Sequence, residues 1–244
     1  MSLTPAMDAF RRLMTVVLIA GSTAGLMLAA VQHVTMGPLI ARAEQYEHAS
    51  AQHGGSHGAG MTAATHGEEW EPADGFERTG YTVLGTVLTG IGFAAVLFGV
   101  ASLLGLELNA ARGLGLGLLA FICCVVAPAV GLPPRPPGAP AAELYAAQWW
   151  WSATVLATTI GVWTMARARG SWPRRVIGVL MVLLPHAIGA PAAMDESAVP
   201  KDLADTFAMA SVATQAVFWL VLGAIGGWLF ARRTGEPSRV SHAP

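Results

Sequence analysis

Six long runs without a formally charged residue dominate this chain of 244 residues. They cover residues 13–41, 79–106, 113–134, 144–166, 176–194 and 206–231, and together they hold 147 residues. About 18 apolar residues suffice for a helix to cross a bilayer. Only 12% of the chain is charged, against roughly 25% in soluble domains. The runs predict an all-α, polytopic transmembrane bundle of about six spans. They exclude a soluble enzyme, a disordered protein or a disulfide scaffold.

We expect the spans at about residues 13–34, 81–105, 114–132, 149–167, 175–192 and 207–231, in one integral membrane domain over 1–244. Residues 35–79 would form an extracytoplasmic loop rich in histidine and acidic residues. Within it, residues 40–52 lack helix breakers and could form a short helix, whereas residues 53–67 contain five glycines and favour a flexible loop. The first run could instead be a cleaved signal peptide, but its length favours a retained helix.

The distribution of basic residues predicts the orientation. With the N-terminus in the cytoplasm and six spans, ten of the fourteen Arg and Lys residues fall inside and four outside. This split follows the positive-inside rule. The four arginines between residues 167 and 175 are its strongest marker. Twelve of the fifteen acidic residues then lie outside, where they would attract cations. Both termini are expected in the cytoplasm.

Small and special residues suggest how the spans pack. G-x-x-x-G spacings at residues 21/25, 113/117 and 223/227 predict close helix contacts. Pro128 and Pro185 lie inside spans, where each would free a backbone carbonyl. The tryptophans at 149–151 are typical of the interfacial aromatic belt. Cys123 and Cys124 are adjacent in the third span, and we interpret them as small apolar residues rather than as metal ligands.

Histidines and carboxylates are the candidate metal ligands, because imidazole and carboxylate together suit divalent first-row cations. Most of the candidates fall in the predicted outer loop, where exchangeable capture is favoured over a rigid site. These loop candidates are Glu44, Glu47, His48, His53, His57, His66, Asp74 and Glu77. The alternative is a solvated polar loop that binds nothing.

His186 and His33 are the candidate ligands within the bundle. His186 lies in a charge-free run directly after Pro185, and ionisable groups in spans usually face a partner or a wet cavity. His33 lies at the outer end of the first span, so the two could face one another at the same depth. The alternative is that His186 serves packing alone.

Several classes of function lack their signatures. The chain has no G-x-x-x-x-G-K-[ST], H-E-x-x-H or G-x-S-x-G motif. The net charge of −1 gives no reason to expect nucleic acid as a partner. We therefore expect no enzyme and no prosthetic group, but a permease for a divalent cation. Two alternatives stay open: a redox subunit with His33 and His186 as axial haem ligands, and an accessory protein that binds metal without moving it.

The sequence resembles the CbtA family of predicted cobalt-transporter membrane subunits along nearly its whole length. The matching features are the Arg-Arg before the first span and residues 37–47, 70–79, 127–134, 148–150, 184–191, 199–200, 207 and 218–219. The resemblance implies cobalt uptake for cobalamin synthesis across the bacterial inner membrane. It also implies a small single-span partner with its own histidines, the family's CbtB subunit. The family is often described with about five spans, whereas the charge pattern here favours six.

Overall fold

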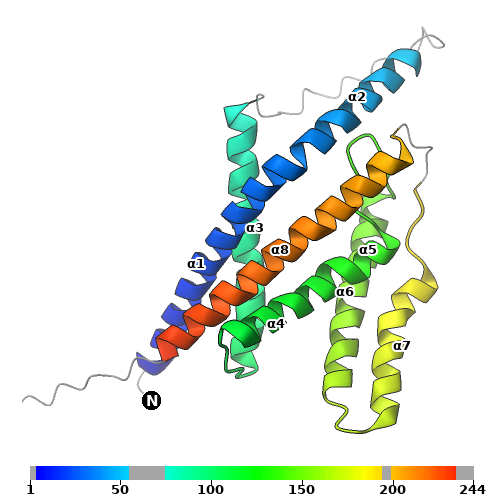
Figure 1. Ribbon diagram of the computed structural model, residues 1–244. Coiled ribbons are helices and arrows are strands. Elements are labelled where there is room, and N and C mark those ends of the chain that lie inside the picture. Colours follow the sequence, from blue (N-terminus) through cyan, green and yellow to red (C-terminus); the bar gives the residue numbers. More distant parts are fainter. Residues whose placement is uncertain (1–3, 55–74, 194–198, 235–244) are drawn as a thin grey trace, which may run out of the picture. The chain divides into compact units, whose positions relative to one another are not determined.

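The computed structural model describes residues 4–54, 75–193 and 199–234, and within these ranges it is all-helical. Each charge-free run of the sequence corresponds to a helical stretch (Figure 1). The elements are α1 (Thr4–Thr35), α2 (Gly37–Gly54), α3 (Phe76–Leu103), α4 (Ala110–Phe121), the π-helical segment η1 (Ile122–Val126), α5 (Ala127–Gly131), α6 (Leu144–Ala166), α7 (Trp172–Ile188) and α8 (Lys201–Thr234). The prediction of an all-α fold is confirmed.

In the part of the chain that the structure describes, four helical stretches are long and apolar enough to cross a membrane. They are Ala6–Thr35, Phe76–Leu103, Ala110–Gly131 and Lys201–Arg232. Large apolar side chains such as Leu88, Val96 and Leu118 are exposed on them, as expected for surfaces that face lipid. The chain is therefore a multi-pass membrane protein. The predicted fourth and fifth spans are helices α6 and α7, but α6 carries polar and aromatic residues and α7 has 17 residues.

The chain divides into two units that are each made of separate segments. The first consists of Met1–Ala30, Pro72–Ala120 and Ala216–Pro244, and the second of Val31–Glu71 and Phe121–Gln215. Each unit is held together by its own set of helix contacts.

Glycines bring the helices of the first unit close together. Gly21 of α1 lies so near α3 that an added Cβ would be 2.6 Å from the Cα of Ile91. Gly113 of α4 lies against α8, where its Cβ would be 2.7 Å from the Cα of Gly227. In the same way, a Cβ on Gly223 would be 2.9 Å from the Cα of Gly117. The predicted close contacts at all three G-x-x-x-G spacings are confirmed, and two of these spacings pair with each other.

Aromatic side chains fill the rest of the first unit. Phe98, Phe218 and Leu222 are fully buried. The rings of Phe93 and Trp219 have centroids 5.0 Å apart, and those of Phe98 and Phe230 are 5.7 Å apart. These rings hold α3 against α8 beside the glycine contacts.

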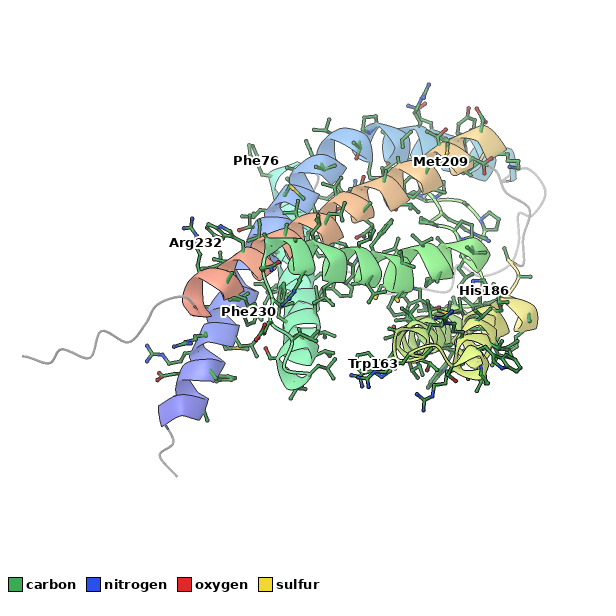
Figure 2. All side chains as sticks on the ribbon, turned by 60° about the horizontal axis from the view of Figure 1, so that its bottom comes forward. Phe76, Trp163, His186, Met209, Phe230 and Arg232 are labelled. Carbon is green, nitrogen blue, oxygen red and sulfur yellow. The ribbon has the colours of Figure 1, made fainter. Side chains whose placement is uncertain are left out.

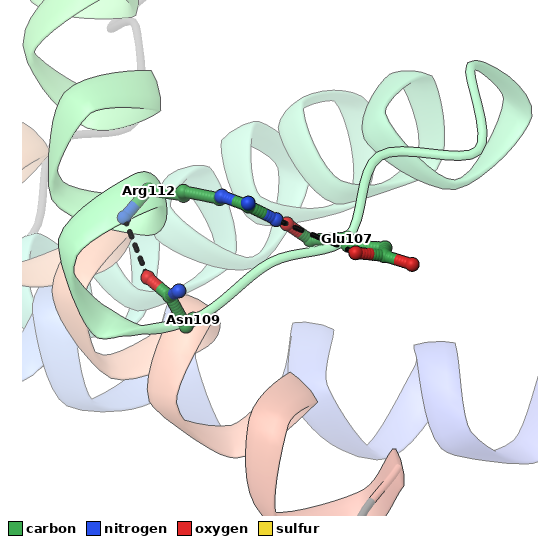
Figure 3. A network of polar contacts seen from close by, with 3 residues as sticks. All are labelled: Glu107, Asn109 and Arg112. Carbon is green, nitrogen blue, oxygen red and sulfur yellow. Dashed lines mark hydrogen bonds and ion pairs between the residues drawn. The ribbon is translucent and has the colours of Figure 1, made fainter.

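A short polar connection joins α3 to α4 (Figure 3). Asn109 caps α4, because its Oδ1 accepts the backbone N–H of Arg112 at 2.9 Å. The Arg112 guanidinium donates to the backbone carbonyl of Glu107 at 2.8 Å and lies 3.6 Å from its carboxylate. Asn109 thus marks the start of α4, while Gly105, with a φ of +63°, follows the end of α3.

The second unit contains the helical hairpin of α6 and α7. Glu143 caps α6 by accepting the backbone N–H groups of Tyr145 and Ala146. The two helices touch at Gly161 and Gly178, where a Cβ on either would lie 2.6 Å from the carbonyl oxygen of the other. α7 ends at Ile188 because Gly189 has a φ of +92°. It therefore ends before residue 192, where we expected the fifth span to end.

The predicted helix around residues 40–52 is present as α2, which belongs to the second unit. Met36 alone separates it from α1, and hydrogen bonds of helical spacing continue across this residue. Ala43 of α2 packs with Val199 and Leu203 in a small buried cluster. The glycine-rich stretch that we expected to be a flexible loop lies almost entirely outside the described residues.

Candidate functional site

Three consecutive helical segments meet around His186 in the second unit. α5 contributes Ala127 and Gly131, α6 contributes Trp150, and α7 contributes Pro185 and His186. We call these five residues the His186 cluster. Figure 2 labels His186 on α7, the helix that packs along α6.

Both ring nitrogens of His186 lie against backbone carbonyl oxygens. Nδ1 is 3.1 Å from the Val182 oxygen, one turn earlier in α7, and Nε2 is 3.0 Å from the Ala127 oxygen. A neutral imidazole has one N–H donor and one lone pair. In either tautomer, one ring nitrogen therefore donates to its carbonyl oxygen, and the other nitrogen faces a carbonyl oxygen with its lone pair.

Trp150 holds the cluster together. Its indole N–H donates to the carbonyl oxygen of Pro185 at 3.3 Å, and this bond is buried. The Trp150 and His186 rings meet edge to face, with centroids 5.9 Å apart. A Cβ on Gly131 would lie 2.7 Å from the indole Cζ2, so the ring fits only because residue 131 is glycine. The contacts of Trp150 thus fix the place of Pro185 and, with it, of His186.

Prolines and the π-helical segment alter the backbone near His186. Pro185 has no N–H, so the Met181 carbonyl four residues earlier lacks its usual helical donor. Pro128 likewise follows η1, in which Ala127 N–H bonds to Ile122, five residues earlier. π-helical segments inside α-helices are frequent at functional sites. Both prolines that we predicted to free carbonyls thus lie in or beside the His186 cluster: Pro185 belongs to it, and Pro128 follows Ala127.

The structure places the other described candidate ligands on α1, α2 and α3. The His33 side chain is exposed near the end of α1, Glu44 is half-buried on α2, and Glu77 is exposed in the first turn of α3. Glu47, His48 and His53 lie within α2, while His57, His66 and Asp74 fall outside the described residues. Among the residues that the structure describes, no three His, Cys, Asp or Glu side chains come together as a metal site.

Sequence reasoning missed the partners of His186. We assigned the three tryptophans at 149–151 to the membrane interface, but Trp150 is buried whereas Trp149 is 76% exposed. A helical spacing could have shown this, because Trp150, Thr154 and Thr158 recur every four residues and form the buried face of α6. The carbonyl oxygens of Ala127 and Val182 carry no signal in the side-chain sequence.

Membrane-length helices and a histidine held among backbone carbonyls define a multi-pass membrane protein with a polar site inside one helical unit. Residues 10–231 match the family described as "Probable cobalt transporter subunit (CbtA)". The chain therefore belongs to the CbtA family and is a membrane subunit for cobalt uptake. No curated protein and no solved structure matches the chain.

Proposed function

We propose that this subunit moves cobalt(II) inward across the bacterial cytoplasmic membrane and that His186 binds the ion on its way. The observation that carries the proposal is the 3.0 Å separation between His186 Nε2 and the Ala127 oxygen, which are both acceptors when Nδ1 carries the ring proton. Two ligand atoms that each lie about 2.1 Å from one metal ion, with an angle of 90° at the ion, are also about 3.0 Å apart. Small shifts of the ring would therefore allow both atoms to bind one ion. The cobalt would serve cobalamin synthesis.

Further ligands would come from outside the His186 cluster. A single imidazole and one carbonyl hold a divalent ion too weakly to extract it from water, so a partner subunit is expected to complete the site. A single-span CbtB-type subunit with its own histidines fits this need. His33, whose side chain is exposed, is a second candidate ligand at the outer end of α1.

The outer acidic and histidine-rich segment would collect the ion before it enters the bundle. Weak ligands are an advantage there, because the ion must leave again for the interior. The candidates are Glu44, Glu47, His48, His53, His57, His66, Asp74 and Glu77.

We also propose that α6 and α7 cross the membrane, which gives six spans with both termini in the cytoplasm. α6 is free of charged residues, and Tyr145 and Trp163 lie about 27 Å apart along it at 1.5 Å per residue. This separation is close to the roughly 30 Å of hydrocarbon that interfacial aromatics flank. Exposed apolar residues cover α7 along its length: Val176, Ile177, Val179, Leu180, Leu183, Leu184 and Ile188.

The ends of the helices support the same orientation. The guanidinium of Arg167 lies over the Trp163 ring at 4.1 Å, at the end of α6. The guanidinium of Arg232 lies over Trp228 at 3.9 Å, near the end of α8. Such pairs place a cation and an aromatic ring together at the membrane surface. Both ends would face the cytoplasm.

The haem alternative requires a free nitrogen of His186 to point toward His33. The ring contacts of His186 come instead from Val182, Ala127 and Trp150. Purified protein is therefore expected to be colourless, with no Soret absorbance.

Replacement of His186 tests the proposal. Radioactive cobalt uptake into cells should rise with the parent chain and fall to background with His186→Ala. His186→Gln keeps a hydrogen-bond donor but binds metal poorly, so uptake should fall by about 10–100-fold. His242→Gln, in the C-terminal tail, is the matched control and should transport normally. Uptake is expressed per copy of membrane-inserted protein. Normal transport by His186→Gln would show that the histidine is structural.

A further inference from the structure

A second polar position lies deeper on the same face of α6. Trp150, Thr154 and Thr158 form this face, and Thr154 and Thr158 are 0% and 2% exposed. Thr158 lies eight residues beyond Trp150, which is about 12 Å along the helix. The face therefore runs from the His186 cluster toward the middle of α6.

The hydroxyl of Thr158 has no hydrogen-bond partner among the described residues, although it is buried. Threonines elsewhere in these helices, such as Thr23, Thr86 and Thr154, donate to the carbonyl four residues earlier. Thr158 does not, so its oxygen is left available. A buried polar group without a partner is unfavourable unless something binds to it.

Neighbouring elements pack on α6 around this face. α6 packs against both η1 and α7. The glycine contact between Gly161 and Gly178 brings α7 close to α6 within one turn of Thr158. Thr158 thus lies near the contact with α7, on the face of α6 that also carries Trp150.

We propose that the Thr158 hydroxyl is a second, transient oxygen ligand for the divalent cation after it leaves His186. This inference rests on the proposed transport function and adds a defined position along the path. A neutral hydroxyl binds a divalent ion more weakly than an imidazole, so the ion would pass onward rather than remain. Oxygen ligands suit harder cations, and a sulfur ligand in the same place would suit softer ones.

Substitutions of Thr158 test the assignment by removing, keeping or replacing its hydroxyl oxygen. Thr158→Val keeps the shape but removes the oxygen, and it should lower the maximal rate of cobalt uptake by about tenfold. Thr158→Ser keeps the oxygen and should transport normally. Thr214→Val is the control, because Thr214 is also buried but its hydroxyl already donates to the Ala210 carbonyl. It should change uptake little.

Thr158→Cys allows a measurement, cadmium competition with cobalt uptake, that would not change if Thr158 had only a structural role. A sulfur ligand should make cadmium compete with cobalt uptake at about tenfold lower concentration than in the parent chain. The competition is a ratio within one sample, so it does not depend on how much protein is inserted. Unchanged cadmium competition in Thr158→Cys, or normal uptake by Thr158→Val, would overturn the assignment. If the parent chain itself fails to raise cobalt uptake, the proposed function fails instead.

Discussion

Trp150 has three kinds of contact that all depend on its position inside the second unit. Its ring covers Gly131, its indole N–H binds the Pro185 carbonyl, and its edge meets His186. Because these contacts link α5, α6 and α7, one side chain fixes the surroundings of the histidine. Neighbouring Trp149 is mostly exposed and has none of these roles.

Trp150→Phe should separate the hydrogen bond from the ring packing. Loss of the indole N–H leaves the Pro185 carbonyl with one donor fewer, which should cost about 1 kcal/mol of unfolding free energy. We expect a lower midpoint of thermal unfolding in detergent and reduced cobalt uptake. Trp149→Phe is the control and should leave both unchanged. Equal effects of the two substitutions would contradict the role assigned to Trp150.

At this scale the sequence revealed His186 but not its surroundings. A histidine after a proline in a charge-free run is readily recognised as a candidate ligand. Three consecutive tryptophans point about 100° apart on a helix, and only the four-residue spacing of Trp150, Thr154 and Thr158 indicates which one faces inward. Thr158 was also missed, because it resembles the other threonines until its hydrogen bonds are known.

At the scale of whole helices, glycine spacing determines which surfaces meet. The seam between α4 and α8 pairs Gly113 and Gly117 with Gly223 and Gly227, so that two backbones touch without side chains between them. Gly115 also lies on α4, but an added Cβ there would meet nothing within 4 Å. Neighbouring glycines on one helix therefore have different roles.

Alanine at these glycines should have opposite effects. Gly113→Ala places a methyl group into the α8 backbone and should destabilise the protein by about 1–3 kcal/mol. Gly115→Ala points into open space and should stabilise α4 by up to about 1 kcal/mol through helix propensity. Unfolding in mixed micelles by a denaturing detergent measures both. Destabilisation of the same size at both positions would show that the seam is not the cause.

The spacing G-x-x-x-G predicted which faces approach another helix, but not their partners. Its period marks one face of a helix, and any other small-residue face could match it. α1 in fact meets α3 at Gly90, which belongs to none of the three spacings. The charge-free run continues past Gly189, so the sequence did not indicate where helix α7 ends, and only the backbone reveals the stop.

For the whole molecule, topology is the feature that most needs a direct test. We expect cysteines introduced at Ser56, Gly138 and Ser197 to react with an impermeant thiol reagent in intact cells. Cysteines at Ser171 and Ser238 should react only after the membrane is opened. Cys123 and Cys124 are first replaced by alanine, so that each sample carries one thiol. Labelling of Ser171 or Ser238 variants in intact cells would overturn the proposed orientation.

Charge-free runs predicted the helices of the whole molecule well, because long apolar segments have few alternatives in a bilayer. They did not predict its division into two units, since this depends on which helix faces pair. The predicted outer ligands also stay predictions, because His57, His66 and Asp74 lie outside the described residues.

The glycine seam between α4 and α8 also has a consequence for the order of assembly. Gly113 and Gly223 are more than 100 residues apart in the sequence, whereas α6 and α7 are joined by a short turn. The hairpin can pair as soon as it leaves the ribosome, but the face of α4 must wait for the last helix of the chain. Until synthesis ends, that glycine face stays uncovered. A chain that stalls before residue 216 would therefore keep the glycine face of α4 uncovered in the membrane. Quality-control proteases could recognise this uncovered face.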